Sequence, residues 1–209
     1  MKNKRVQELN LYAKGLLVVI GFAAVITSCS KEDPVKEDAP ELITEAVLTF
    51  NPTTGGGTTV VVTATDPDGE GVQDISADGP INLQAGVQYV LTIELHNTLA
   101  GIGQPGYNIT DEVEEEGEEH LFLFSWTGPV FQIPTGDGNI DNRADAVSYA
   151  DLDDGGLPVG LITTWTTAGS AGAGTFRILL KHQPGLKTST SGSTIGETDL
   201  DLTFTINVL

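Results

Sequence analysis

From residue 42 onward the chain alternates short β-branched runs with turn-forming residues, and this alternation limits its fold more than any other feature. The candidate strands are residues 43–50, 58–65, 88–95, 120–126, 146–149, 159–165, 175–182 and 200–208. Gly, Pro, Asn and Asp separate these runs, and no stretch shows a convincing apolar period of 3.6 residues. We therefore predict an all-β domain, an antiparallel β-sandwich of seven or eight strands, with a closed β-barrel as the alternative.

The last candidate strand shows the clearest two-residue period. One of its faces is apolar and consists of Leu200, Leu202, Phe204, Ile206 and Val208. The other face is polar and consists of Asp201, Thr203, Thr205 and Asn207. A strand of this kind has one face in the core and one in water, which fits the outer layer of a sandwich.

Composition limits the number of domains and the kind of partner. The 209 residues are 39% hydrophobic, enough for one core and one domain. They contain 29 Asp and Glu against 10 Lys and Arg, a formal charge of −19, so the chain is too acidic to bind a nucleic-acid backbone. The single cysteine excludes a disulfide framework and a zinc site made of several thiolates.

The first 28 residues have the layout of a secretory signal peptide. Basic residues precede an uncharged apolar run from Gly15 to Ile26, which is short for a membrane-spanning helix. The sequence Ile26-Thr27-Ser28-Cys29 resembles the lipobox of bacterial lipoproteins, in which the cysteine is diacylated and becomes the mature N-terminus. This resemblance predicts lipid attachment at Cys29; an ordinary cleavage site with an incidental cysteine is the alternative.

Residues 29–41 form a polar segment that is too poor in apolar residues to bury a core, so we predict a disordered tether before a single domain at 42–209. Lys31, Glu32 and Asp33 resemble the export signal of surface-exposed Bacteroidetes lipoproteins; a solvated linker without a signal is the alternative. Removal of residues 1–28 takes away four bases and one acid and leaves a charge of −22. Such a charge favours divalent cations as partners.

An acidic run precedes the strand at 120–126 and suggests a metal site. Seven of the ten residues from Asp111 to His120 are acidic, and this density costs Coulomb energy unless water or a cation reduces it. The ligands that we predict for Zn²⁺ or a similar ion are His120 and His182 with Glu116, Glu118 and Glu119, and we place His96 outside this set. The site requires the strands of the two histidines to be neighbours; otherwise the run is a solvated loop.

A second cation site is predicted at Asp66, Asp68 and Glu70. These residues have the 1, 3, 5 spacing of an EF-hand loop, with Gly71 at position 6, which suggests Ca²⁺. The rest of that motif is missing, because position 12 is Ala77 and no helical pattern flanks the loop. Turns rich in Asp and Gly also connect ordinary hairpins, and this is the alternative.

Catalytic motifs are missing from the sequence. No Gly-x-Ser-x-Gly motif is present, and the Gly101-Ile102-Gly103 segment lacks the context of a dinucleotide-binding loop. We therefore expect no catalytic residues and no enzyme activity. Trp126 and Trp165, with Tyr107, Phe131 and Tyr149, are candidates for a sugar-stacking platform, but tryptophans on strands are more typical of a core.

The mature chain resembles small flavobacterial and other Bacteroidetes outer-membrane lipoproteins of uncharacterised function. The residues that carry this resemblance are the Gly-rich turn at 55–57, the Asp66 loop, the stretch 109–122 and the strand start at 196–199. Some of these proteins are labelled as type 1 periplasmic binding folds, a two-lobed α/β architecture, whereas this chain lacks βαβ patterning. The resemblance implies a lipid-anchored binding or accessory protein beside a TonB-dependent receptor. A surface glycan-binding protein and a structural module are the alternatives.

Overall fold

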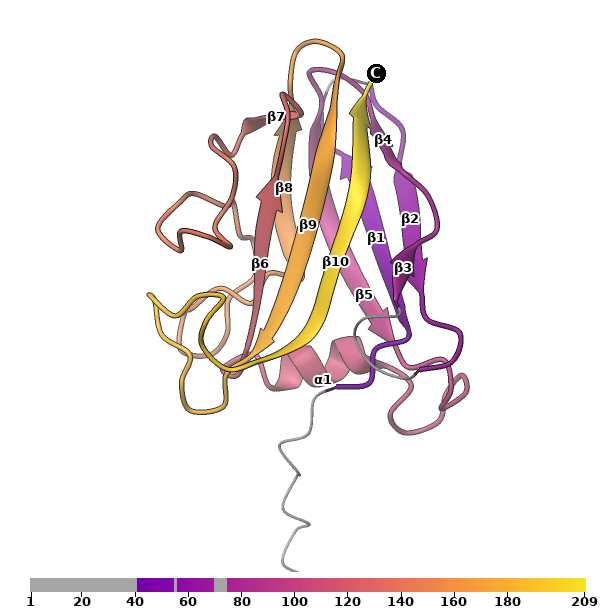
Figure 1. Cartoon of the computed structure of the whole chain (residues 1–209), viewed down its shortest axis with the longest axis vertical. Helices are drawn as coiled ribbons and strands as arrows, with labels where there is room; N and C mark the ends of the chain where they lie inside the picture. Colours follow the sequence, from indigo (N-terminus) through magenta and orange to yellow (C-terminus); the bar gives the residue numbers. More distant parts are fainter. Residues whose placement is uncertain (1–40, 55, 70–74) are drawn as a thin grey trace, which may run out of the picture. The chain divides into compact units, whose positions relative to one another are not determined.

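The computed structural model describes residues 41–54, 56–69 and 75–209. These residues belong to one of the two units into which the chain divides, 38–209. They form an all-β fold of two sheets with one short helix, as the sequence predicts (Figure 1). The predicted lipid attachment site Cys29 and the predicted export residues Lys31, Glu32 and Asp33 lie outside the described residues.

The first sheet has six strands in the order β3-β2-β1-β5-β8-β7. Their bounds are β1 Glu45–Pro52, β2 Val60–Thr65, β3 Ser76–Ala77, β5 Gln88–His96, β7 Phe131–Ile133 and β8 Ile162–Thr167. All neighbouring strands in this sheet are antiparallel. Its inward residues are apolar, so that Leu48, Leu91 and Trp165 are fully buried.

The second sheet has four strands in the order β4-β10-β9-β6. Their bounds are β4 Ile81–Leu83, β6 His120–Trp126, β9 Gly172–His182 and β10 Glu197–Val208. The antiparallel prediction fails at one place, because β4 runs parallel to β10, with Ile81 opposite Ile206. Only three residues separate β3 from β4, so the chain crosses from one sheet to the other there.

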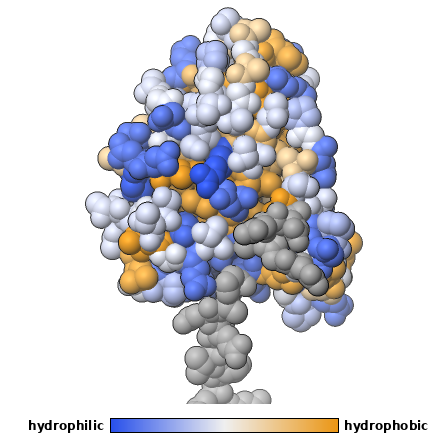
Figure 2. Space-filling model, viewed as in Figure 1, coloured by the Kyte–Doolittle hydropathy of each residue, from blue (hydrophilic) through white to orange (hydrophobic). Residues whose placement is uncertain are grey.

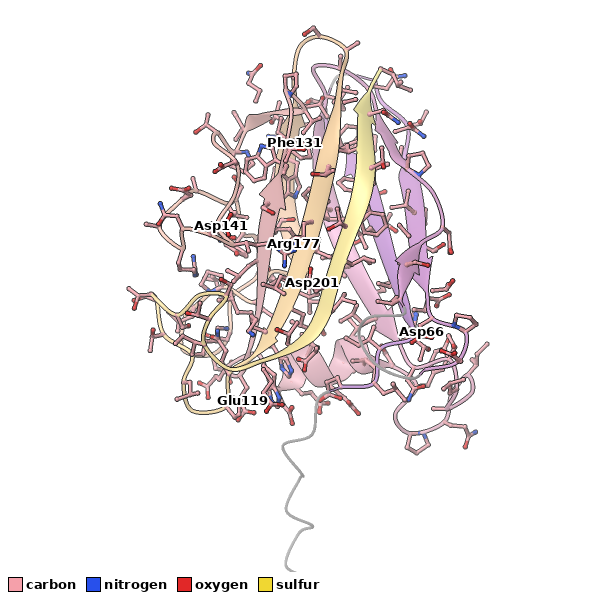
Figure 3. The ribbon with its side chains drawn as sticks, viewed as in Figure 1. Asp66, Glu119, Phe131, Asp141, Arg177 and Asp201 are labelled. Atoms are coloured by element: carbon pink, nitrogen blue, oxygen red, sulfur yellow. The ribbon has the colours of Figure 1, made fainter. Side chains whose placement is uncertain are left out.

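The core lies between the two sheets. The apolar face predicted for residues 200–208 is buried, and the polar face carries exposed Asp201, Thr203 and Thr205. Figure 2 shows hydrophilic residues at the middle of the outer face of β6, β9 and β10. There Arg177 of β9 binds Asp201 of β10 through two hydrogen bonds of 2.7 and 2.6 Å (Figure 3).

The long connection 134–161 covers the free edge of β6. Backbone bonds join Trp126 to Asp137, Phe124 to Asn139 and Phe122 to Val159. The side chain of Asn139 also accepts a bond from the Phe124 N–H at 2.9 Å. This edge is therefore satisfied within the chain.

The prediction of a strand at 146–149 is wrong, because this segment is held by the side chain of Tyr149 and not by a ladder of backbone bonds. Tyr149 makes only an isolated bridge to Thr163, and its hydroxyl donates to the Phe122 carbonyl at 2.7 Å. The strand predicted to begin at Val159 begins at Ile162. The reason is that the Gly160 and Leu161 N–H groups bind the Asp151 carboxylate and so do not join a ladder.

A helix that the sequence analysis missed, α1 Ile109–Glu115, lies at one end of the sandwich (Figure 1). Ile109 and Val113, four residues apart, are buried and attach it to the core. Its last turn has no basic residue, although the C-terminal end of a helix carries partial negative charge. No helix in the described part of the chain is long and apolar enough to cross a bilayer.

Candidate metal site

His120 and His182 are direct cross-strand partners. They begin β6 and end β9, which are adjacent antiparallel strands, so the strand neighbourhood required by the sequence prediction is present. Their rings stack at a centroid distance of 4.7 Å with an interplanar angle of 7°. Both residues are buried, with exposed fractions of 0% and 5%. Both face inward, since Phe122 and Leu180, two residues along each strand, lie in the core.

Glu116 joins the two histidines from the end of α1. It is the C-cap residue of the helix, four positions before His120, and its backbone carbonyl lies 3.2 Å from Nδ1 of His120. One carboxylate oxygen of Glu116 and one ring nitrogen of each histidine lie within 4.8 Å of one another. A short helix that leads directly into β6 therefore places a carboxylate beside two imidazoles.

The other two predicted ligands have different positions. Glu119 contacts His182, with its Oε2 atom 3.4 Å from Nε2, and Figure 3 places it at the α1 end of the domain. Glu118 is exposed, lines the neighbouring cleft and does not belong to the close group. The structure therefore brings three of the five predicted residues into the close group, with Glu119 in contact with His182 and Glu118 beside them.

Asp199 is a site residue that the sequence analysis missed. Its Oδ2 atom lies 3.7 Å from Nε2 of His120, and both side chains are fully buried. Burial raises the pKa of Asp199 to about 6, while the nearby His182, Glu41 backbone and Lys181 act in the opposite direction. An acidic residue directly before the apolar alternation that starts at Leu200 gives no sequence signal for such a position.

Lys181 precedes His182 in β9, so strand alternation places it on the opposite face of the sheet from the histidine. Its ammonium donates to Thr198 at 2.8 Å. Burial lowers the pKa of Lys181, and Asp199 and Glu197 partly offset this effect. Its positive charge counts against cation binding and must be outweighed by the surrounding carboxylates.

A cleft of about 520 Å³ opens beside the group and gives access from solvent. Eight acidic residues line it: Glu114, Glu115, Glu116, Glu118, Glu119, Asp151, Asp153 and Asp154. Glu116 belongs both to this wall and to the close group with the histidines. A concave surface lined by one sign of charge concentrates ions of the opposite sign.

A buried ion pair fixes one wall of the cleft. Lys187 donates to Asp153 at 2.7 Å and to the Gly117 carbonyl at 2.6 Å, and the two side chains are 1% and 2% exposed. Burial lowers the pKa of Lys187. Burial acts to raise the pKa of Asp153, but the bond and charge of Lys187 and the N–H bonds from Leu157 and Gly155 together outweigh it, and the net shift is downward. Through these bonds Lys187 connects Gly117 of the acidic run with the loop that contains Asp153.

The chemistry of the group suits a divalent transition metal. Imidazole nitrogens and carboxylate oxygens are the ligands of zinc, cobalt and nickel sites. The two rings are nearly parallel, so their in-plane lone pairs do not converge on one point. Binding of a shared ion therefore requires at least one ring to turn about its Cβ–Cγ bond.

The predicted calcium loop has a structural role in the described residues. The Asp66 carboxylate accepts N–H bonds from Asp68 at 3.1 Å and Gly69 at 2.9 Å, which is an Asx turn. The bond from Gly69 lowers the pKa of Asp66. Glu70, the third predicted ligand, lies outside the described residues. Asp66 belongs to a different part of the domain from Glu119 (Figure 3).

His96 and the aromatic residues take no part in the metal site. His96 binds Glu45 at 2.9 Å and stacks on Tyr107, in the other sheet. Trp126 and Trp165 lie in the core, as their position on strands predicts. They are therefore not exposed for stacking against a sugar.

The chain is thus an all-β protein in which a buried pair of histidines lies beside an acidic cleft. Comparison of the chain with protein-family models, curated proteins and solved structures finds no match. The geometry of the site is therefore what indicates a function for this chain.

Proposed function

We propose that this chain is a lipid-anchored, non-enzymatic binding protein of the outer membrane that holds a divalent transition metal ion at Glu116, His120 and His182. The observation that carries the proposal is the close group itself, two buried stacked imidazoles with a carboxylate oxygen, all within 4.8 Å. An imidazole nitrogen with a free lone pair and a carboxylate oxygen are the atoms that bind such an ion, and one ion can be shared by all three side chains.

The acidic cleft supports the same proposal. It joins Glu116 to solvent and raises the local concentration of cations, so it serves as the route to the histidines. Zn²⁺ is the ion that we expect, with Co²⁺ and Ni²⁺ as substitutes. The Asp66 loop is a weaker candidate for a Ca²⁺ site, because one carboxylate oxygen of Asp66 already accepts the N–H bonds of the Asx turn.

The test is calorimetric titration of the full chain, purified in detergent, with zinc, cobalt and nickel. Wild type should bind one ion, and His182→Asn should lose at least tenfold in affinity because one nitrogen ligand is removed. His96→Asn is the matched control, since His96 pairs with Glu45 in the other sheet and should leave the affinity unchanged. Absence of binding by wild type, or equal losses in both variants, would contradict the proposal.

The location is supported by the sequence of residues 26–33 and has its own test. Cys29→Ala should move the protein from the membrane fraction to the soluble fraction, because all acyl chains depend on this residue. Replacement of Lys31, Glu32 and Asp33 by Ala should leave the protein lipidated but protected from external protease. The lipoprotein resemblance supports a TonB-dependent receptor as partner, and co-purification after cross-linking tests that pairing.

A further inference from the structure

Asp199 has an orientation that the strand pattern alone does not explain. In β10 the inward residues are Leu200, Leu202 and Phe204, so a regular strand would direct Asp199 outward, as it does Asp201. The register between β10 and β9 shifts between Thr198 and Leu200, which makes Asp199 the extra residue of a β-bulge. Asp199 and Leu200 are consequently both buried. Bulges redirect side chains in this way beside functional sites.

The buried carboxylate of Asp199 is poorly compensated. Neither of its oxygens accepts a hydrogen bond of ordinary length from the described residues. The backbone of Glu41 and the side chains of His182 and Lys181 are the groups that act on it. A buried carboxylate with so few partners destabilises the fold, whereas a bound cation would reverse this effect.

The orientation of His120 directs a ring nitrogen to this carboxylate. In the tautomer in which Nδ1–H donates to the Glu116 carbonyl at 3.2 Å, Nε2 carries the lone pair and faces Asp199 Oδ2 at 3.7 Å. A backbone carbonyl that holds one nitrogen while the other binds metal is a common arrangement for histidine ligands. A lone pair that faces a carboxylate is repulsive unless a proton or a metal ion lies between them.

Two separations in this region each fit a pair of ligands on one ion. Two ligands at about 2.1 Å from a tetrahedral zinc ion are separated from each other by about 3.4 Å. The separation from His120 to Asp199 is 3.7 Å, and that from His182 to Glu119 is 3.4 Å. Both pairs are therefore close to the spacing of two ligands on one ion, and the first is longer than a hydrogen bond.

We propose that Asp199 is a further ligand, which binds the same transition metal ion as Nε2 of His120. This inference rests on the proposed function. The ion would lie between β6, β9 and β10, with His182 and the carboxylates of Glu116 or Glu119 as its other ligands. Two nitrogens with carboxylates suit zinc, cobalt and nickel, whereas calcium takes six to eight oxygens.

The experiment measures zinc affinity and the cobalt spectrum of the full chain in detergent. Asp199→Asn keeps the shape of the side chain but removes its charge, and we expect at least a tenfold loss of zinc affinity. With Co²⁺ bound, the positions and intensities of the d–d bands should change in this variant. Asp201→Asn, two residues along the strand but on the outer face, is the matched control and should change neither quantity.

A ligand role and a merely structural role predict different results. Asp199→Glu keeps a carboxylate and should bind zinc more tightly than Asp199→Asn, and this comparison serves as well if the Asn variant fails to fold. Zinc binding and a cobalt spectrum equal to wild type in Asp199→Asn would overturn the assignment of Asp199 while the proposed function stands. Absence of zinc binding by wild type would overturn both, and selective binding of calcium would overturn the stated class of ion.

Discussion

The β6–β9 strand pair joins two regions of opposite chemistry. At one end Trp126 lies opposite Phe176, and at the other end His120 lies opposite His182. The aromatic end packs Trp165 against Phe124, Trp126, Phe131 and Phe176 at centroid distances between 4.8 and 5.5 Å. In Figure 3, Phe131 lies toward this end and Glu119 toward the other.

The same cross-strand geometry therefore has two energetic consequences. Aromatic rings gain free energy from burial and from edge-to-face contacts. Imidazoles of similar shape bring buried nitrogens, a carboxylate and an ammonium to the opposite end, and the desolvation of these groups costs free energy that their bonds and charges must offset. The comparison indicates that the aromatic end supplies stability, whereas the imidazole end carries the proposed metal site.

The largest expected effect is at the aromatic end. Trp165→Ala should lower the free energy of unfolding by about 4 kcal/mol, because it leaves a large cavity and removes the indole donor of Thr163. Urea unfolding measures this change. Trp165→Phe, which retains most of the ring volume, should cost clearly less; equal losses would show that packing does not carry the stability of this end.

The buried ion pair beside the cleft should give the next largest effect. Lys187→Met leaves the Asp153 carboxylate without its cation in a site where both side chains are almost fully buried, and should cost about 3 kcal/mol. The double variant Lys187→Met, Asp153→Leu should recover part of this loss, since no unpaired charge remains. A double variant that is less stable than Lys187→Met would contradict this explanation.

Asp199 should make stability depend on pH in the metal-free protein. Its pKa is about 6 in the fold against an ordinary 3.8, so the folded state binds this proton more tightly than the unfolded chain does. The resulting stabilisation is complete below about pH 4 and is lost as the pH rises through about 6, a change of about 2 to 3 kcal/mol.

Asp199→Asn should remove this fall while the contributions of all other groups remain. The measurement is urea unfolding of wild type and variant in a chelating buffer at several pH values. The difference between the two proteins should shift in favour of the variant as the pH rises. Parallel curves would show that Asp199 is not the group responsible.

The smallest effect is expected on the outer face. Asp201→Asn breaks the bonds to Arg177, but both side chains are more than a third exposed, so the loss in unfolding free energy should be below about 1 kcal/mol. Added salt should reduce the difference further. A loss of unfolding free energy as large as that of Lys187→Met would show that the exposed pair and the buried pair contribute equally to stability.

The sequence predicts the parts of this molecule that depend on local pattern. The two-residue period of 200–208 and the apolar run at 120–126 identify strands because each residue's burial follows from its neighbours along the chain. Helix α1 was not predicted, because seven residues with two buried apolar positions show too little helical periodicity. Strand β4 was not predicted for a similar reason, since its three residues are too few to show alternation.

The site depends on pairing between distant segments, and its predictability differs accordingly. Its residue types are visible in the acidic run, but the contact between His120 and His182 requires a strand order that no local pattern contains. Asp199 was missed because alternation assigns it to the outer face, and the bulge that turns it inward arises from register with β9.

The position of β10 has a consequence for how the protein is made. This strand follows the other described strands in the sequence, yet it lies between β9 and β4 and pairs with both. A chain synthesised or exported from its N-terminus therefore cannot complete the four-stranded sheet until residues 197–208 emerge. Late, long-range pairing of this kind slows folding and keeps the preceding segments open. The order of strands along the chain thus delays completion of this sheet until β10 is available.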